Sequence, residues 1–186
     1  DSAAFLSRYV SRDVRVDVHT DPAFVVGRLS QKSVDSAADS VLGVNLQPAK
    51  DFRQNVPSLR GLTEDQYLEF WARVILGASN SGKRVRVLSN GSLDDYAAAR
   101  KVIAHLHSKG VQIELEPRPV CVEELLEQIS RLSSMVSTRM HAGIVARGLG
   151  ISVAPILWDS KVSAVWQQVG GMKYVVPGET LLSEDP

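Results

Sequence analysis

The sequence predicts an α/β protein of the Rossmann-like kind, with a mostly parallel sheet and helices on both of its faces. Three observations support this prediction. Short apolar runs alternate with longer amphipathic stretches, as they do in consecutive βαβ units. Polar helix-capping residues precede the amphipathic stretches, and glycines follow several of them. The chain has 186 residues, of which 44% are hydrophobic, and is long enough to bury a sizeable core.

The predicted elements follow one another in a regular order along the chain. The strands are expected at about residues 41–46, 85–88, 111–115, 135–137, 151–157 and, last and short, 174–176. The helices are expected at about residues 63–80, 92–109, 122–132, 140–149 and 159–169. Thr63 with Gln66 forms a capping-box pattern, whereas residues 47–61 are predicted to be a loop. Strands that alternate with crossover helices in this way indicate a parallel sheet.

Residues 1–38 fit this rhythm less well and are predicted to be a separate segment. Val14, Val16 and Val18 alternate as in a strand, and a stretch of small polar residues further on indicates a linker. The Rossmann-like domain is therefore predicted over residues 39–186. The first residues are typical of the middle of a helix and no methionine starts the chain, so we expect a truncated or processed chain.

Composition argues against several classes of function. The 21 basic and 21 acidic residues balance, so nucleic acid and anionic membranes are not expected as partners. Cys121 is the single cysteine, so an internal disulfide is excluded, and no Cys/His spacing indicates a metal site. Asp94 and Asp95 lie in the first turn of a helix, where acids are expected, and are not interpreted as metal ligands. No apolar run approaches the ~20 residues of a membrane-spanning helix and the first residues lack a signal-peptide pattern, so a cytoplasmic protein is predicted.

The most informative polar segment is Ser-Thr-Arg-Met-His-Ala at residues 137–142, where a predicted strand ends and a helix begins. In a parallel sheet, ligands bind at the carboxyl ends of the strands. The free N–H groups of a helix start favour an anion, and Arg139 adds a planar, permanently charged donor for a carboxylate or phosphate. His141 lies within reach of the same ligand and can transfer protons near neutral pH. Ser137 or Thr138 is expected to cap the helix.

Two other strand ends are also candidates for ligand contacts. Lys161 lies in the first turn of a helix that Asp159 is expected to cap, and the helix dipole disfavours a cation there unless an anion is bound nearby. Asn45 and Gln47 offer amide groups at the end of the first strand. No P-loop and no G-x-G-x-x-G motif is present. From residue types alone, the 137–142 segment also fits a helix cap with a solvated arginine and a partly buried histidine.

The 137–142 segment resembles the S-x-R-M-H-A motif of the polysaccharide pyruvyl transferase family, and the likeness continues over nearly the whole chain. The other similar segments are Asp-Pro-Ala-Phe at 21–24, Val-Leu-Gly-Val-Asn-Leu-Gln at 41–47, the helix and strand that lead into the motif, Leu-Gly-Ile-Ser-Val at 149–153 and Trp-Asp-Ser-Lys-Val at 158–162. Three positions depart from the family pattern: Trp158 replaces a tyrosine, Ser160 a proline and Gln47 an arginine-like residue. The resemblance implies that Gln47, in place of the arginine-like residue, could alter the affinity for the donor or the binding of the acceptor.

The resemblance implies a two-lobed architecture like that of GT-B glycosyltransferases, with residues 1–38 ending a missing N-terminal lobe and residues 39–186 forming the donor-binding lobe. The implied reaction moves the pyruvyl group of phosphoenolpyruvate onto sugar hydroxyls of a polysaccharide or its lipid-linked precursor. It needs no cofactor and no metal, and it takes place in the cytoplasm or at the inner face of the membrane. His141 is the implied catalytic residue. The predicted phosphoenolpyruvate-binding residues are Asn45, Thr138, Arg139, Met140 and Lys161.

Two other functions remain open on the sequence alone. A GT-B glycosyltransferase or a sugar epimerase would use a nucleotide-sugar, and would need a ribose-binding acid and a platform for the base. The sequence offers no clear candidate for either feature. A non-catalytic module would bind a sugar or a phosphate without turnover, and the pairing of Arg139 with His141 argues against it.

Overall fold

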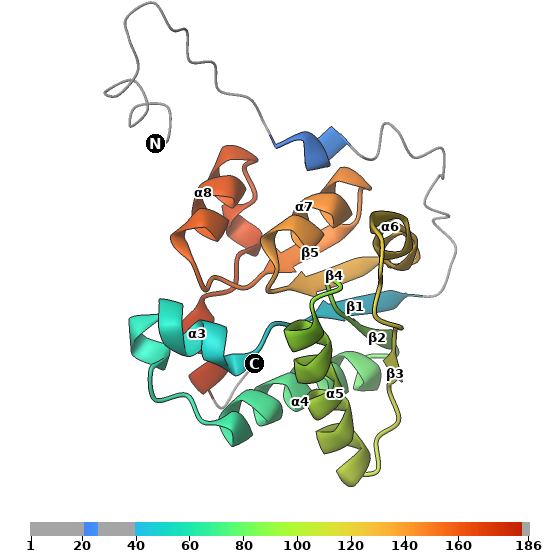
Figure 1. Ribbon diagram of the computed structural model, residues 1–186, viewed down its shortest axis with the longest axis vertical. Coiled ribbons are helices and arrows are strands. Elements are labelled where there is room, and N and C mark those ends of the chain that lie inside the picture. Colours follow the sequence, from blue (N-terminus) through green and yellow to red (C-terminus); the bar gives the residue numbers. More distant parts are fainter. Residues whose placement is uncertain (1–20, 26–39, 184–186) are drawn as a thin grey trace, which may run out of the picture.

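The computed structural model describes residues 21–25 and 40–183, which contain a five-stranded, all-parallel sheet (Figure 1). The strand order is β3-β2-β1-β4-β5. The strands are β1 (Val41–Asn45), β2 (Arg84–Leu88), β3 (Glu114–Leu115), β4 (Ser134–Ser137) and β5 (Ser152–Pro155). This arrangement confirms the predicted α/β, Rossmann-like fold class.

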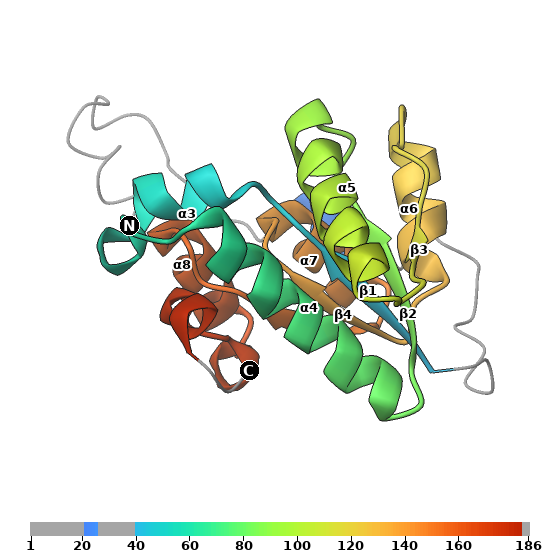
Figure 2. The ribbon, with the colours of Figure 1, turned by 90° about the horizontal axis from the view of Figure 1, so that it is seen from below.

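Helices cover both faces of the sheet (Figure 2). The α-helices are α3 (Ala49–Asn55), α4 (Glu64–Asn80), α5 (Leu93–Ser108), α6 (Val122–Ser130), α7 (Met140–Gly148) and α8 (Ser160–Gln168). The 3-10 helices are η1 (Pro22–Val25), η2 (Pro57–Leu59), η3 (Met172–Tyr174) and η4 (Gly178–Leu182). One buried cluster joins the sheet to α3, α4 and α5, and a second joins its other face to α6, α7 and α8.

The side chains of β1 alternate between these two cores, as the pleat of a strand requires. Leu42 and Val44 belong to the core under α4 and α5, whereas Val41 belongs to the core under α6 and α7. Gly43 faces Leu132, and a Cβ at this glycine would lie 2.3 Å from a Leu132 methyl carbon. The glycine therefore lets the chain between α6 and β4 pack closely on the centre of the sheet.

The predicted helix boundaries agree well with the structure. Thr63 and Gln66 form a capping box at the start of α4, in which the Thr63 hydroxyl accepts from the Gln66 N–H at 3.1 Å and the Gln66 side chain accepts from the Thr63 N–H at 2.9 Å. Gly110 and Gly150 follow α5 and α7 with φ of 79° and 81°, a conformation that favours glycine. Sequence patterns therefore located both kinds of helix end.

Three predicted elements differ from the structure. The predicted loop at 47–61 contains α3 and η2. The predicted strand at 111–115 is reduced to Glu114–Leu115. The predicted strand at 174–176 is wrong, because Tyr174 ends η3 and Val176 forms an isolated parallel bridge with Ile156. The predicted strand around Val14–Val18 and the boundary near residue 38 lie outside the described residues.

Candidate active site

The polar segments noted in the sequence meet at the carboxyl edge of the sheet. Asn45 ends β1 in register with Leu88 of β2 and with Ser137 of β4, and Ser137 is in register with Pro155 of β5. Four strand ends therefore lie side by side at one level. The chain leaves them toward α3, α5, α7 and α8, so four strand-to-helix junctions meet at this edge, the usual place of ligand sites in parallel α/β sheets.

Asn45 joins three of these strand ends. Its side chain is buried, and its Nδ2 donates to the Leu88 carbonyl at 3.3 Å and to Asn90 Oδ1 at 3.2 Å. Its Oδ1 accepts from the Ser137 hydroxyl at 3.3 Å. Thr138 donates both its N–H and its hydroxyl to the Asn45 carbonyl, each at 3.1 Å. Asn45 and Thr138 thus hold the junctions together, and their contact with a ligand stays a prediction.

The start of α7 is built differently from what the sequence predicted. Arg139 is the N-cap residue, with an extended backbone (φ −94°, ψ 118°), and its side chain makes no capping hydrogen bond. The Ser137 hydroxyl donates to the Arg139 carbonyl at 2.9 Å, and the Thr138 hydroxyl donates back to β1. The predicted cap by Ser137 or Thr138 is therefore wrong, because both hydroxyls act as donors to carbonyl groups.

The guanidinium group of Arg139 lies between two carboxylates. Its Nε donates to Asp95 Oδ2 at 2.9 Å, and its Nη2 donates to Asp95 Oδ1 at 2.5 Å. The same Nη2 also donates to Asp51 Oδ2 at 3.0 Å. Arg139 Cζ lies 5.8 Å from the centroid of the Trp158 ring, which follows β5. Arg139 therefore connects all four junctions, since Asp51 lies in α3, Asp95 in α5 and Trp158 before α8.

These ion pairs are largely withdrawn from water. The exposed fraction of the side chain is 1% for Asp95, 18% for Asp51 and 24% for Arg139. Burial by itself would lower the pKa of the Arg139 guanidinium, but hydrogen bonds and charges from Asp95 and Asp51 outweigh it and raise the pKa above its ordinary value. Arg139 is thus a permanent cation, and its two carboxylate partners leave no surplus of positive charge on this cluster.

The three nitrogens of the Arg139 guanidinium differ in their hydrogen bonds. Within the described part of the chain, Nη1 makes no hydrogen bond, whereas Nε and Nη2 do. Trp158, whose ring lies beside the guanidinium, donates its Nε1–H to the Thr138 carbonyl and is thereby fixed in place. The guanidinium is therefore held from two sides, with two N–H groups left on Nη1.

His141, the predicted catalytic residue, lies in the first turn of α7 and is open to solvent. Its side chain is 67% exposed, and its Nε2 lies 3.6 Å from Asp21 Oδ2. Asp21 precedes η1, which packs on α7 (Figure 1) so closely that a Cβ at Gly148 would lie 2.9 Å from the Phe24 carbonyl oxygen. The 21–25 segment therefore brings a carboxylate to an exposed histidine.

The remaining predicted site residues differ in their surroundings. Lys161 has an exposed side chain that makes no ion pair with any described residue, and its N–H donates to Asp159 Oδ1 at 2.8 Å. The predicted cap of α8 by Asp159 is thus confirmed. Met140 is partly buried and packs on the core under α6, α7 and α8. Ligand contacts of Lys161 and Met140 stay predictions.

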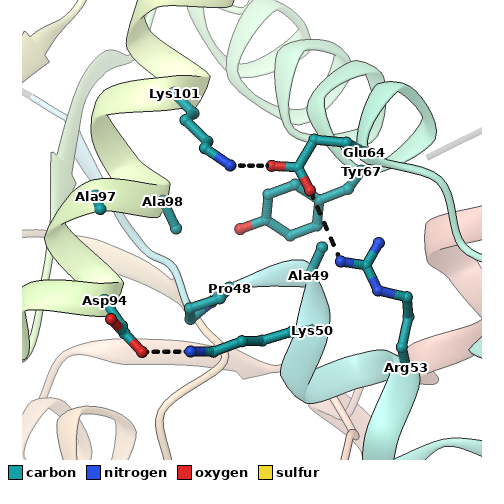
Figure 3. Close-up of a pocket in the computed structure, with 10 residues that line it drawn as sticks. All are labelled: Pro48, Ala49, Lys50, Arg53, Glu64, Tyr67, Asp94, Ala97, Ala98 and Lys101. Atoms are coloured by element: carbon teal, nitrogen blue, oxygen red, sulfur yellow. Dashed lines mark hydrogen bonds and ion pairs between the residues drawn. The ribbon is translucent and has the colours of Figure 1, made fainter.

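A pocket of about 210 Å³ opens at the starts of α3, α4 and α5 (Figure 3). The lining residues are Pro48, Ala49, Lys50, Arg53, Glu64, Tyr67, Asp94, Ala97, Ala98 and Lys101. Ion pairs cross it, from Lys50 to Asp94, from Lys101 to Glu64 at 2.7 Å and from Arg53 to Glu64 at 3.9 Å. The pocket therefore has a mixed, internally compensated charge. The sequence did not predict it.

Gln47, one of the departures from the family pattern, lies beneath this region. Its side chain is buried, and neither of its polar side-chain atoms has a hydrogen-bond partner in the described part of the chain. The Tyr67 hydroxyl donates to the Gln47 carbonyl at 2.6 Å, and burial raises the pKa of this tyrosine. Gln47 therefore places a neutral amide, buried and without a described partner, at the position where the family pattern has an arginine-like residue.

Sequence reasoning missed the two acids that hold Arg139. Asp95 has the place of an ordinary first-turn acid, yet it lies three, four and seven positions before Ala98, Ala99 and Val102 on the buried side of α5. An acid on an apolar helix stripe indicates a buried partner, and this was the available signal. Asp51 gave no such signal, because its segment was predicted to be a loop.

The described residues contain no group of His, Cys, Asp and Glu side chains that could hold a metal ion. None of the helices in residues 21–25 and 40–183 is long and apolar enough to cross a membrane.

Comparison with known proteins agrees with the motif at the start of α7. A search of curated proteins and a search of solved structures found no match. The family model of the polysaccharide pyruvyl transferases matches residues 1–160, which include Arg139 and His141 and end one residue before Lys161. Because the match covers most of the 186 residues, the chain belongs to the polysaccharide pyruvyl transferase family.

Proposed function

We propose that this chain binds phosphoenolpyruvate at the carboxyl edge of its sheet and provides the donor side of a pyruvyl transfer to sugar hydroxyls. One observation carries this proposal. At the start of α7, the Arg139 guanidinium is fixed by two carboxylates, and His141, two residues further on, has an exposed side chain. Nη1 of Arg139 has no hydrogen-bond partner among the described residues, and the His141 side chain is 67% exposed. This donor requires a cation for an oxyanion and a proton carrier, and residues 139–141 supply both.

The proposed reaction begins at the methylene carbon of phosphoenolpyruvate. His141 supplies a proton to this carbon, and positive charge develops at C2, which carries the phosphate and the carboxylate. A sugar hydroxyl adds to C2 and loses its proton, and the C2–O bond to phosphate then breaks. Phosphate leaves at this step, and a second hydroxyl of the sugar then adds to C2 and loses its proton, which closes the ketal. Of the two hydroxyl protons, one returns to His141 and the other leaves with the phosphate.

The charges near Arg139 bear on which groups take up the phosphate. Asp51 and Asp95 already neutralise the guanidinium, so Arg139 alone cannot balance a phosphate and a carboxylate. Lys161 at the start of α8 is an exposed cation without a partner among the described residues. We propose that Lys161 and the N–H groups at the helix starts stabilise the departing phosphate, whereas Arg139 orients the donor.

The test is a calorimetric titration of the chain with phosphoenolpyruvate. We expect a Kd between about 10 µM and 1 mM, which corresponds to roughly 4–7 kcal/mol. Arg139→Lys keeps the charge but removes the planar fork, and should weaken binding at least ~10-fold. Arg147→Lys, at the other end of α7, is the matched control and should leave the Kd unchanged.

Two outcomes would contradict the proposal. The first is equal affinity of the Arg139→Lys and Arg147→Lys variants for phosphoenolpyruvate. The second is binding of UDP in place of phosphoenolpyruvate, which would favour a nucleotide-sugar enzyme. Release of phosphate in the presence of sugar acceptors, followed in parallel, separates an enzyme from a module that only binds.

A further inference from the structure

The Arg139 guanidinium offers two edges to oxyanions, and its carboxylate partners occupy them unequally. Asp95 fills the Nε/Nη2 edge with both of its oxygens, at 2.9 and 2.5 Å. Asp51 occupies half of the Nη1/Nη2 edge, through one oxygen at 3.0 Å from Nη2. A bidentate carboxylate or phosphate needs two parallel N–H groups on one edge. The edge open to such a ligand is therefore the one that Asp51 partly blocks.

The two acids also differ in how the fold holds them. Asp95 is 1% exposed and lies on the buried side of α5, so its carboxylate has no route to water without leaving the core. Asp51 has an 18% exposed side chain and lies in α3, a helix of seven residues. A buried carboxylate that loses its cation is strongly destabilised, whereas a partly exposed one can be hydrated instead. Asp51 is thus the carboxylate that can leave the guanidinium and be hydrated.

We propose that Asp95 is the permanent positioning residue of Arg139, and that Asp51 is a counterion that an oxyanionic donor displaces. This inference rests on the proposed function, since it assigns the Nη1/Nη2 edge to the donor's carboxylate or phosphate. Before the donor binds, Asp51 pairs with Nη2 of the arginine, and it competes with the donor for this nitrogen. The two acids therefore act on donor affinity in opposite directions, although both contact the same guanidinium.

Titrations of the 186-residue chain with phosphoenolpyruvate test the sign of each effect. Asp51→Asn keeps the shape of the side chain but replaces a charged acceptor with a weaker neutral one, and should lower the Kd at least about threefold. Asp95→Asn should raise the Kd at least about tenfold, because the guanidinium loses its bidentate partner. Asp94→Asn is the matched control, since Asp94 adjoins Asp95 but pairs with Lys50, and its Kd should stay within about twofold of the wild type.

The same three variants are titrated with inorganic phosphate, which reports on the guanidinium edge without assuming the donor. Tighter binding by Asp51→Asn and weaker binding by Asp95→Asn, for either anion, supports the inference. If only inorganic phosphate shows this pattern and phosphoenolpyruvate does not bind, the proposed donor is wrong while the roles of the two acids stand. Weaker binding by both variants overturns the inference, and so does an effect of Asp51→Asn equal to that of Asp94→Asn.

Discussion

Asp95 of α5 binds Arg139 at the start of α7 through both carboxylate oxygens, and the contact joins residues 44 positions apart in the chain. Only 1% of the Asp95 side chain is exposed, so the guanidinium provides the charge compensation that a buried carboxylate needs. Arg139 thus supports the fold as well as the candidate active site. A truncation of this arginine is therefore expected to change the stability of the protein and the proposed anion site together.

Arg139→Ala is therefore expected to lower the free energy of unfolding by roughly 3–5 kcal/mol, because it leaves the Asp95 carboxylate buried without a partner. The double variant Arg139→Ala/Asp95→Asn should recover most of this loss, since no buried charge then remains. Urea denaturation of the two single variants and the double variant measures the coupling. Losses that simply add would show that the two side chains are energetically independent.

His141→Asn is expected to lower turnover of phosphoenolpyruvate with an acceptor sugar at least ~100-fold, as the loss of a general acid–base group does. The free energy of unfolding should change by less than about 0.5 kcal/mol, because the side chain is 67% exposed. His107→Asn, an exposed histidine on α5, is the matched control. If turnover falls equally in both variants, His141 has no specific role in the reaction.

Lys161→Ala should lower turnover at least ~10-fold if this lysine meets the departing phosphate. The Tm should not change, because the exposed side chain has no partner among the described residues. Lys83→Ala removes an equal charge just before β2, at the opposite edge of the sheet, and should have no effect on turnover. If the activities of the two lysine variants agree within twofold, Lys161 is an ordinary surface residue.

The sequence predicted the parts of the fold that depend on local patterns. The capping box of Thr63 and Gln66 predicted the start of α4, and Gly110 and Gly150 predicted the ends of α5 and α7. Each of these residues lies within a few positions of the helix boundary that it predicts. The helix α3 was missed because prolines flank its short run, at Pro48 and Pro57, and indicate a loop. A helix of seven residues leaves little periodicity to detect.

The candidate site was only half predictable, for a physical reason. Arg139 and His141 lie in one motif, so the sequence could name both as candidates. Asp51 and Asp95 lie 88 and 44 positions from Arg139, and acids in a first helical turn are expected whether or not they bind a cation. Their role depends on the register of three parallel strands, which brings the junctions together.

Gly148→Ala tests whether the 21–25 segment positions His141, the proposed catalytic residue. The new Cβ would lie 2.9 Å from the Phe24 carbonyl oxygen, which is backbone, so η1 must shift away from α7 and take Asp21 from His141. We expect lower kcat with little change in KM, and faster hydrogen exchange at the Phe24 N–H, which bonds the Asp21 carbonyl at 3.0 Å. Gly77→Ala in α4 meets nothing within 4 Å and is the control. Unchanged exchange at Phe24 would contradict the expected displacement.

A cluster far from the candidate site gives a prediction for pH. Glu69 on α4 accepts from Lys109 at 2.5 Å and from His105 at 3.1 Å, both on or just after α5. The hydrogen bond from Lys109, followed by that from His105, lowers the pKa of Glu69 below its ordinary value of 4.5. The two hydrogen bonds of Glu69 therefore connect α4 to the C-terminal end of α5, on the face of the sheet that both helices cover.

A carboxylate whose pKa is lower in the folded state stabilises the fold above its unfolded-state pKa, and this contribution disappears as the pH falls through the folded-state pKa. Glu69→Gln should therefore lower the free energy of unfolding at pH 7, by at most about 1 kcal/mol, because the side chain is 42% exposed and screened by solvent. Below pH 4.5 the difference between Glu69→Gln and the wild type should shrink progressively toward zero. High salt at pH 7 should reduce this difference in the free energy of unfolding as well.

Urea denaturation at a series of pH values measures the difference, and Glu127→Gln, which removes an exposed ion pair with Arg131 at the end of α6, is the control. A difference that stays constant from neutral to acid pH would show that Glu69 stabilises the helix pair by packing and not by its charge.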